Sequence, residues 1–580
     1  MKRTPYYILI PILALSMLSG CGPDKSQPSS EEISQINIRL QRDPQFVNPL
    51  FYPTAVGREI SQYIYLPSAD FHPKDLKLTP VLIENIPEGV ETTYEGKNAT
   101  SFDLTFRKEA QWSDGRPITA KDYVFTLNAI VHPQSKISAY KPFYQYLLGM
   151  EIDAENERKV TVYYDRSFML SLESAVNAPL FPAHVYDEQG MFGTDFLAKI
   201  KAEGYTASDS TELRLLDKLN ASPTQKMEVV QSGPYKLTAA ESNQYYLLEK
   251  KPNYWGSALQ DIPNLNANID KIMFTIVPEE VTALTMAKEG KLDLMAVQSS
   301  QDFLDMKNDD NHNENWTFNL PQLFRYYYIA INNKSDKLNN PEIRNALAHL
   351  ADVDDYIKTL DSGFGIRTTG HFHPGKAYYN DTVKPLAYDP SSSEKLLEKL
   401  GWQTAAGDSY RSKSIDGKKV PLELDLLITG SPLSKNMALM YQEEAKKVGI
   451  KINLVTKKTS LMRKENLFDY KYDLALLVNG TSESHDDPYP KFHSDNVKPG
   501  GSNIYGYSNP AVDKMIDELR LTLDEEDRFQ IYRNIQAQMY VDMPVIFLYC
   551  PMRKIIISDK FRATTTTKRP GYLANTFVPS

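Results

Sequence analysis

The sequence predicts an α/β protein of several domains, in which strands and helices are interspersed. The chain has 580 residues, enough for two or three large lobes or for about four domains of ordinary size. Apolar residues make up 41% and charged residues 24%, close to the averages of globular proteins, which excludes global disorder. Strand-like and helix-like patterns follow one another along the chain without a short internal repeat.

Charge and tyrosine content bear on the class of ligand. The formal net charge is −9, so electrostatics give no reason to expect a nucleic-acid partner. The chain contains 36 Tyr residues. Tyr combines a rigid apolar face with a polar tip, which suits a hydrated binding cleft, although partly exposed packing accounts for the same number.

The N-terminus predicts export followed by lipid attachment. A basic start precedes the apolar run 6–18, and small residues then lead to Cys21. This order is typical of a secretory signal peptide, which we expect over residues 1–20. Leu-Ser-Gly-Cys, ending at Cys21, also resembles the bacterial lipobox, whereas an ordinary signal peptide with a chance cysteine is the alternative. Residues 21–35 are then the lipidated cysteine and a polar linker.

The mature chain is therefore expected outside the cytoplasm, anchored to the cell membrane by its lipid on the periplasmic or outer surface. Two acyl chains anchor a protein stably. The chain has no later apolar run of about 18 residues that would span a membrane. Cys550 is left without a partner and follows the apolar run 545–549, so we expect it to be a buried small side chain.

Strands are predicted where apolar residues alternate with polar ones. This alternation, with a period of two, is typical of a strand with one buried face. It occurs at 102–106, 160–164, 272–276 and 422–428.

Helix starts are predicted from capping residues. An Asn or Asp followed by Pro supplies an acceptor for a free N–H and a first helical residue that needs none. Thr119 with Asp122 has the spacing of a capping box. The Asx-Pro pairs are Asn340-Pro341, Asp389-Pro390 and Asn509-Pro510, and a last helix carries Tyr532, Ile535 and Met539 on one face before a strand at 545–549.

The motifs of common enzymes are absent from the sequence. There is no P-loop, no His-Glu-x-x-His and no Gly-x-Ser-x-Gly. His371 and His373 have a spacing that suits a metal, but no third ligand lies nearby and a loop is the simpler interpretation. His485-Asp486-Asp487 likewise fits either a metal or a solvated acidic turn. We expect no catalytic residue, no resident metal and no cofactor.

Five landmarks along the chain carry a family resemblance. In the first, Trp-Ser-Asp-Gly-Arg-Pro at 112–117 makes a tight turn before the helix that Thr119 caps. The five are 102–107 with 112–122, 232–237 with 253–256, 269–272 with 288–293, 343–347 with 351–352, and 507–513 with Arg528, Tyr532 and 542–545. In this order they resemble the bacterial extracellular solute-binding proteins of oligopeptide- and dipeptide-binding type, which are lipoprotein components of ATP-binding cassette (ABC) importers.

The resemblance implies a fold like that of type II periplasmic binding proteins, with two lobes and an extra inserted domain. The ligand would lie between the lobes, and the protein would be a monomer that closes around it and delivers it to the permease. The expected division is lobe I at 36–72, 227–320 and 536–580, inserted domain II at 73–226, and lobe III at 321–535.

The resemblance also implies where a ligand would bind. Peptide binders of this family hold the α-amine with an Asp three residues before an acid-Pro pair. Asp487-Pro488 matches that pair here, but Ser484 stands in place of the Asp. Glu483, Asp486 or His485 would substitute for it by a small shift in register.

Further ligand contacts are expected from both lobes. In lobe I these are Phe46 and Asn48, in a Pro-bounded loop where turn packing is the alternative. In lobe III, Arg367 lies in a Gly-rich loop, where it would meet a carboxylate of the ligand unless it is merely solvated. The predicted binding residues are thus Phe46, Asn48, Arg367, Glu483, Ser484, Asp486 and Asp487.

The leading hypothesis is a lipid-anchored protein that binds peptides for an ABC permease. A second hypothesis keeps the fold and changes the solute to a metal chelate, haem, an opine or an oligosaccharide, with His371, His373 and His485 important for a metal chelate. A third hypothesis is a secreted hydrolase or a sensor partner on the same scaffold, for which the sequence displays no nucleophile.

Overall fold

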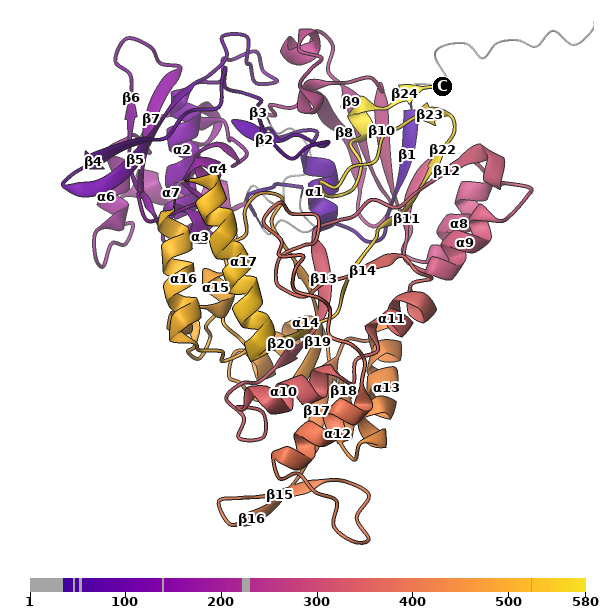
Figure 1. Cartoon of the computed structure of the whole chain (residues 1–580). Helices are drawn as coiled ribbons and strands as arrows, with labels where there is room; N and C mark the ends of the chain where they lie inside the picture. Colours follow the sequence, from indigo (N-terminus) through magenta and orange to yellow (C-terminus); the bar gives the residue numbers. More distant parts are fainter. Residues whose placement is uncertain (1–34, 45–46, 52–54, 138–139, 222–229, 523) are drawn as a thin grey trace, which may run out of the picture.

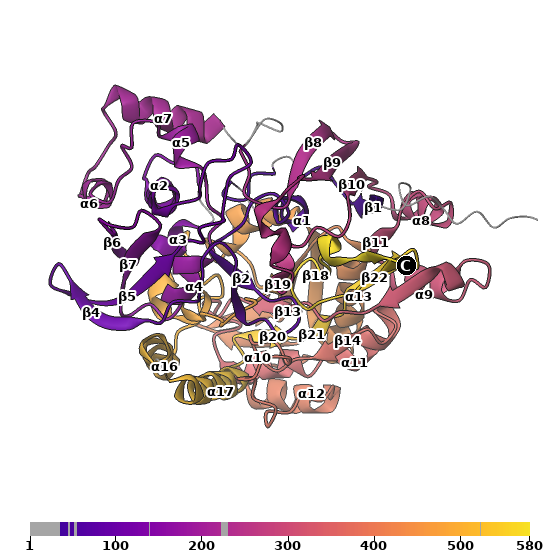
Figure 2. The ribbon, with the colours of Figure 1, turned by 90° about the horizontal axis from the view of Figure 1, so that it is seen from above.

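The computed structural model describes residues 35–44, 47–51, 55–137, 140–221, 230–522 and 524–580. Three sheets, of seven, four and five strands, mark three parts of the molecule. In Figure 1 the four-stranded sheet lies at the upper left, the seven-stranded sheet at the upper right and the five-stranded sheet below them. Figure 2, which looks down from above, separates the first two in the same way.

The seven-stranded sheet brings together distant segments of the chain. Its order is β12-β22-β11-β1-β10-β9-β8, and β1 runs parallel to β10 and β11 while the other pairs are antiparallel. Apolar side chains of α8 and α9 pack on one of its faces. The elements are β1 (Gln35–Leu40), α1 (Ala55–Ser61), β8 (Tyr235–Glu241), β9 (Tyr245–Lys250), β10 (Lys271–Ile276), α8 (Glu280–Lys288), β11 (Leu294–Val297), α9 (Ser300–Lys307), β12 (Trp316–Asn319) and β22 (Lys554–Ser558).

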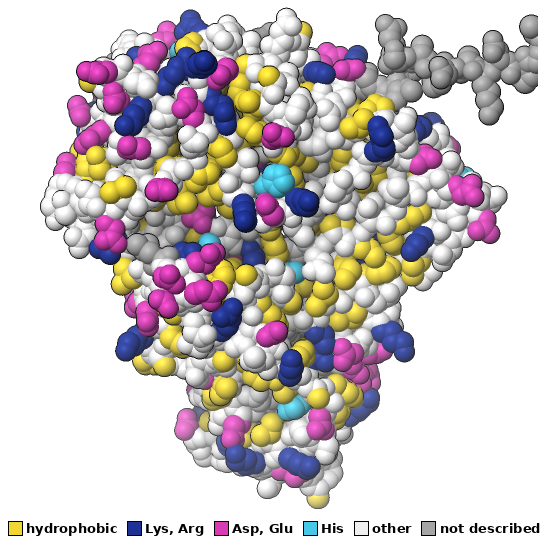
Figure 3. Space-filling model, turned by 45° about the horizontal axis from the view of Figure 1, so that its top comes forward, with side chains coloured by type: hydrophobic (Ala, Val, Ile, Leu, Met, Phe, Trp, Pro, Cys, Tyr) yellow, Lys and Arg dark blue, Asp and Glu magenta, His cyan; other side chains and the backbone are white. Residues whose placement is uncertain are grey.

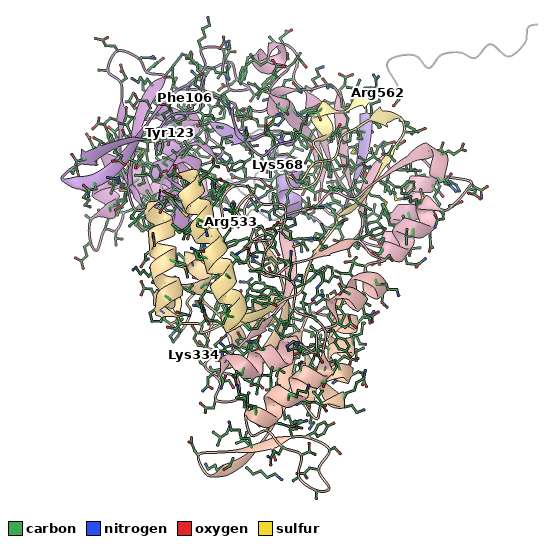
Figure 4. The ribbon with its side chains drawn as sticks, in the orientation of Figure 1. Phe106, Tyr123, Lys334, Arg533, Arg562 and Lys568 are labelled. Carbon is green, nitrogen blue, oxygen red and sulfur yellow. The ribbon has the colours of Figure 1, made fainter. Side chains whose placement is uncertain are left out.

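The four-stranded sheet is antiparallel, in the order β4-β5-β7-β6. Phe106 and Tyr123, labelled in Figure 4, have ring centroids 6.1 Å apart in the core beneath it. The elements are β2 (Ala69–Phe71), β3 (Leu78–Pro80), β4 (Val90–Tyr94), β5 (Lys97–Thr105), α2 (Ala120–Val131), α3 (Lys141–Tyr144), β6 (Leu147–Ile152), β7 (Lys159–Asp165), α4 (Ser171–Val176), α5 (Ala183–Tyr186), α6 (Phe196–Lys201) and α7 (Ser210–Ala221).

The five-stranded sheet has the order β18-β17-β19-β13-β20, with β17 parallel to both of its neighbours. Its strands are β13 (Arg325–Ile331), β17 (Glu423–Ile428), β18 (Lys451–Thr456), β19 (Leu474–Gly480) and β20 (Val545–Phe547). The accompanying helices are α10 (Pro341–Ala348), α11 (Val353–Asp355), α12 (Pro390–Lys399), α13 (Pro432–Lys447), α14 (Thr459–Met462), α15 (Tyr489–Phe492), α16 (Pro510–Leu521) and α17 (Glu525–Asp542).

Short two-stranded pairs complete the sheets. They are β14 (Gly365–Arg367) with the distant β21 (Tyr549–Pro551), the hairpin of β15 (Ser412–Ile415) and β16 (Lys418–Pro421), and β23 (Phe561–Arg562) with β24 (Val578–Pro579). Among the described residues no helix is both long enough and apolar enough to cross a membrane.

The predicted helix starts are confirmed. The side chains of Asn340, Asp389 and Asn509 accept backbone N–H groups at the starts of α10, α12 and α16. Asp122 accepts the N–H of Thr119 at the start of α2. These predictions depend only on local chemistry, and so do the strands predicted at 102–106, 160–164, 272–276 and 422–428. They are found as β5, β7, β10 and β17; β5 begins earlier, at Lys97, and the other bounds agree within one residue.

One expected boundary falls in a different place. The sequence division ends lobe III at residue 535 and gives 536–580 to lobe I. However, α17 continues to Asp542, and β20 pairs with β13 of the five-stranded sheet. The chain therefore returns to the seven-stranded sheet only after β20, because an unbroken helix leads directly into that strand. The division into lobes otherwise stays a prediction.

Candidate functional site

A cavity of about 910 Å³ lies where the three parts of the molecule meet. Each part supplies a portion of its wall. The lining includes Arg58, Glu59, Gln62, Tyr65 and Asp70 near α1; Tyr140, Tyr144, Tyr146 and Glu173 beside the four-stranded sheet; His371, residues 480–487, Tyr489, Lys491 and Arg520 beside the five-stranded sheet; and Arg553 and 568–570 near the C-terminus. This volume is typical of a site for a small ligand.

Residues 481–487 form one wall, which we call the binding loop; it follows directly from β19. Asp486 anchors it from within, because its carboxylate accepts the N–H of Ser482 and the hydroxyl of Tyr378, each at 2.9 Å. Burial raises the pKa of Asp486 against the opposing charge of Lys376. Lys376 Nζ also donates to the carbonyl oxygens of Glu483 and Ser484. The loop is therefore fixed from behind.

Hydrogen bonds join the parts across the cavity. Ser484 Oγ donates to Glu173 Oε1 of α4 at 2.6 Å. Arg520 Nη2 donates to the hydroxyl of Tyr146 at 2.7 Å, and the peptide N–H of Arg569 donates to Glu483 Oε1 at 2.9 Å. Because these bonds link segments distant in sequence, the structure shows the arrangement in which the parts are drawn together around the cavity.

Most acids of the lining are neutralised by a cation. Ion pairs join Glu59 to Arg553 at 3.4 Å, Asp70 to Lys568, Glu483 to Arg569 at 3.6 Å, and Asp487 to Arg520 at 3.4 Å. Figure 4 labels Lys568 in the upper middle of the molecule. Figure 3 likewise shows acidic and basic side chains interspersed on the face that it presents. The lining therefore offers charges of both signs rather than one uniform field.

Two cations of the lining lack such a partner among the described residues. Arg58 is exposed on α1 and has no acidic side chain paired with it. Lys491 donates to the amide oxygen of Asn479, and burial lowers the pKa of Lys491 to about 8. Neither residue was identified from the sequence. Their only sequence signal is charge, which 65 Lys and Arg residues share.

The predicted site residues are only partly brought together. Glu483, Ser484, Asp486 and Asp487 all line the cavity, and Asp486 is buried rather than solvated in an acidic turn. Asn48 is buried and its side chain accepts the N–H of Leu50, as expected for turn packing. Phe46 and Cys21 lie outside the described residues.

Arg367 lies in strand β14 rather than in a loop, and it is not part of the cavity lining. Its guanidinium pairs with Asp354 at 2.8 Å and donates to the carbonyl oxygen of Leu386. The two glycines at 363 and 365 suggested a loop, whereas pairing with the distant strand β21 makes the segment extended.

The histidines considered for a metal chelate are in different surroundings. His371 and His485 line the cavity, whereas His373 is buried against Phe324 and is not among the lining residues. His371 Nδ1 lies 2.7 Å from the hydroxyl of Tyr326, and burial lowers the pKa of His371 well below its usual value. In the described part of the chain, no three His, Cys, Asp or Glu side chains are grouped to hold a metal ion.

The buried ammonium of Lys376 predicts a dependence of stability on pH. Burial lowers the pKa of Lys376 to about 8, from 10.5 in an exposed side chain. Between these values the unfolded chain binds more protons than the folded chain, so this group's contribution to the free energy of unfolding rises with pH. We expect Lys376→Met to remove that rise, which is limited to about 1.4 kcal/mol per pH unit for one proton.

Urea unfolding at several pH values from 7 to about 10 measures this difference. The stability of the wild type relative to the variant should grow across the range. Burial also lowers the pKa values of Lys251 and Lys491. Both residues are present in the wild type and in the variant, so their contributions cancel in the difference between the two free energies of unfolding. Parallel pH profiles for the two proteins would contradict the assignment.

Three comparisons place the chain among known proteins. The family model described as bacterial extracellular solute-binding proteins, family 5 Middle, matches residues 77–500. The oligopeptide-binding protein AppA of Bacillus subtilis (strain 168) is 22% identical over 568 residues, covering 95% of this chain and 94% of the relative. The nickel-binding periplasmic protein of Escherichia coli (strain K12) is 26% identical over 326 residues, covering 55% and 59%.

A solved structure shares the fold. The oligopeptide-binding protein AppA from Bacillus subtilis, in complex with a nonapeptide, is similar with a TM-score of 0.71 and 20% identity. The similarity covers 94% of this chain and 99% of that one. The fold and the cavity between its three parts thus define a binding protein of the type II periplasmic class, as the resemblance implied.

The chain belongs to the bacterial extracellular solute-binding proteins, family 5, because the family model spans most of its length. The family resemblance seen in the sequence is confirmed. The chain is therefore a substrate-binding protein of the kind that serves ABC importers. These relatives are named for binding rather than for catalysis, in agreement with the prediction that the chain is not an enzyme.

Proposed function

We propose that this chain binds peptides in the cavity and delivers them to the permease of an ABC importer. The observation that carries the proposal is the cavity lining with charges of both signs and several Tyr rings. A peptide has a charge at each end and side chains of varied character between them. A lining that pairs its own charges and presents aromatic faces can accept such a ligand without selecting for one peptide sequence.

The carboxylate end of the peptide has a candidate partner in Arg58. Arg58 lies in the lining without an acidic partner among the described residues, and a guanidinium can hold a carboxylate with two parallel hydrogen bonds. Arg367, the partner expected from the sequence, is already paired with Asp354 away from the cavity.

The rest of the proposal concerns placement in the cell. Cys21 would carry the lipid that anchors the protein to the membrane, and the linker that ends near residue 35 would let the binding protein, as a monomer, reach the permease. The support is the lipobox-like sequence at Cys21 and membership of an extracellular family.

A thermal shift measurement tests the peptide proposal. The chain from residue 22 onward is unfolded and refolded to remove bound solutes, and a mixed peptide digest is added. A ligand at about 100 times its Kd stabilises the folded state by roughly 2.7 kcal/mol, so the midpoint should rise with the digest but not with free amino acids.

A flat response to the digest would reject peptide as the cargo. The second candidate is a metal chelate, favoured by the presence of His371 and His485 in the lining and by the nickel-binding relative. In that case nickel with histidine should raise the midpoint, and Ala at both histidines should abolish the rise.

A further inference from the structure

Glu173 differs from the other acids of the cavity lining. Four of the six pair with Lys or Arg. The fifth, Asp486, is 4% exposed and is occupied by hydrogen bonds from within the protein. Glu173 is the one whose described partners are a Ser and a His, and 18% of its side chain remains exposed.

No Lys or Arg among the described residues pairs with the carboxylate of Glu173. Ser484 Oγ donates to Oε1 at 2.6 Å, and His485 Nδ1 lies 3.5 Å from the same oxygen. Arg528 Nη2 lies 3.2 Å from His485 Nε2, and a guanidinium only donates, so that nitrogen is the acceptor and the ring proton is on Nδ1. Arg528 lies behind the ring and is not part of the lining.

The position of Glu173 is fixed by the core of the four-stranded part. The hydroxyls of Tyr144 and Tyr123 donate to the carbonyl oxygens of Ser174 and Ala175, at 2.7 and 2.8 Å, and so hold α4 from its buried side. Burial would raise the pKa of Glu173, but the hydrogen bonds from His485 and Ser484 outweigh it and keep that pKa below its usual range. The carboxylate is ionised at neutral pH and faces the cavity from a rigid support.

A carboxylate of this kind has room for a further donor. Both protein partners reach Oε1, and no donor of another described residue reaches Oε2. Ser484 Oγ also lies 3.4 Å from His485 Nδ1, which leaves one of its two lone pairs for a ligand. A primary ammonium has three N–H groups and can bond Oε2 and this remaining lone pair together. Since the attraction between opposite charges is stronger at a largely buried carboxylate than in water, this contact favours a cationic ligand group.

We propose that Glu173 binds the α-ammonium group of the peptide, and that Ser484 and His485 position it for this role. The proposal deepens the proposed function and rests on it. The acid that selects for a free amine then comes from α4, in contact with the binding loop but not part of it.

A competition experiment with random peptides tests this assignment, whichever peptide sequence the protein prefers. The refolded chain from residue 22 is incubated with an equimolar mixture of random pentapeptides with free N-termini and the same peptides N-acetylated. Retained peptides are counted by mass spectrometry. The variants are Glu173→Gln, which keeps the shape and removes the charge, and Glu173→Gln with Ser484→Asp, which returns a carboxylate beside it.

The wild type should retain free peptides over acetylated ones by about tenfold or more, as expected for a charged hydrogen bond. Glu173→Gln should bring that ratio close to one while still retaining acetylated peptides, and the double variant should restore the preference. An unchanged ratio in Glu173→Gln, or equal loss of both peptide classes, would overturn the assignment. Absence of any peptide retained by the wild type would instead reject the proposed function.

Discussion

Replacing Lys554 with Met is expected to lower the free energy of unfolding by about 3–5 kcal/mol, the range measured when one partner of a buried ion pair is removed. Lys554 Nζ lies 2.8 Å from Asp361 Oδ1, and the side chains are only 7% and 4% exposed. Without the ammonium, Asp361 would remain as a buried charge. Urea unfolding measures the loss.

The pair matters because it joins two parts of the molecule. Lys554 begins β22 of the seven-stranded sheet, whereas Asp361 follows α11 beside the five-stranded sheet. Ser300 Oγ and the hydroxyl of Tyr549 also donate to Asp361, at 2.8 and 2.9 Å. The residue before Lys554, Arg553, lines the cavity, so a disturbance at this junction should also weaken ligand binding.

Two further variants separate the buried charge from other effects. Adding Asp361→Asn to the Lys554→Met variant removes the charge and keeps an acceptor, and it should recover a large part of the lost stability. Lys419→Met breaks an exposed pair, 2.9 Å from Asp408, and should change stability by less than about 1 kcal/mol. The explanation fails if Lys554→Met behaves like Lys419→Met.

Local features of the fold were predictable from the sequence because their causes are local. An Asn or Asp before Pro caps a helix wherever it occurs, and α10, α12 and α16 begin at such pairs. Cys550 is buried, as its apolar neighbours indicated. The sequence also located residues 481–487, which line the cavity, since the Asp487-Pro488 pair gave their position in the resemblance; their role in binding stays a prediction.

Features that depend on pairing between distant residues were not predictable in this way. Glu173 lies 311 residues before Ser484, and nothing in the sequence around it distinguishes it from other Glu residues on helices. Arg367 was assigned to a loop because strand β14 exists only through its pairing with β21. For the same reason the periodicity of α17 did not show which sheet the following strand would join.

Replacing Gly233 with Ala is expected to destabilise the protein by about 3 kcal/mol, at the upper end of the range for overpacking. An added Cβ would lie 2.3 Å from the carbonyl oxygen of Tyr63 and 2.9 Å from Cα of Ile64. Both are backbone atoms, so no side chain can rotate to make room. This explains why the landmark at 232–237 requires Gly at its second position.

The backbone here also supports the cavity. Gly233 N donates to the carbonyl oxygen of Ile64 at 3.0 Å, and the N–H of Leu66 donates to Ser232 Oγ at 2.9 Å. Gln62 and Tyr65, on the same short segment, line the cavity. A shift that relieves the clash must therefore displace these two side chains, so Gly233→Ala should weaken ligand binding as well as stability.

Gly430→Ala is the matched control for this prediction. No atom lies within 4 Å of a Cβ added at Gly430, and its backbone is not left-handed. Alanine there should leave stability unchanged or raise it by up to about 1 kcal/mol, because it restricts only the unfolded chain. If the two variants unfold at the same urea concentration, close backbone contact is not the reason for Gly233. If Gly233→Ala alone loses both stability and ligand binding, the contact between 63–66 and 232–235 is what holds this wall of the cavity in place.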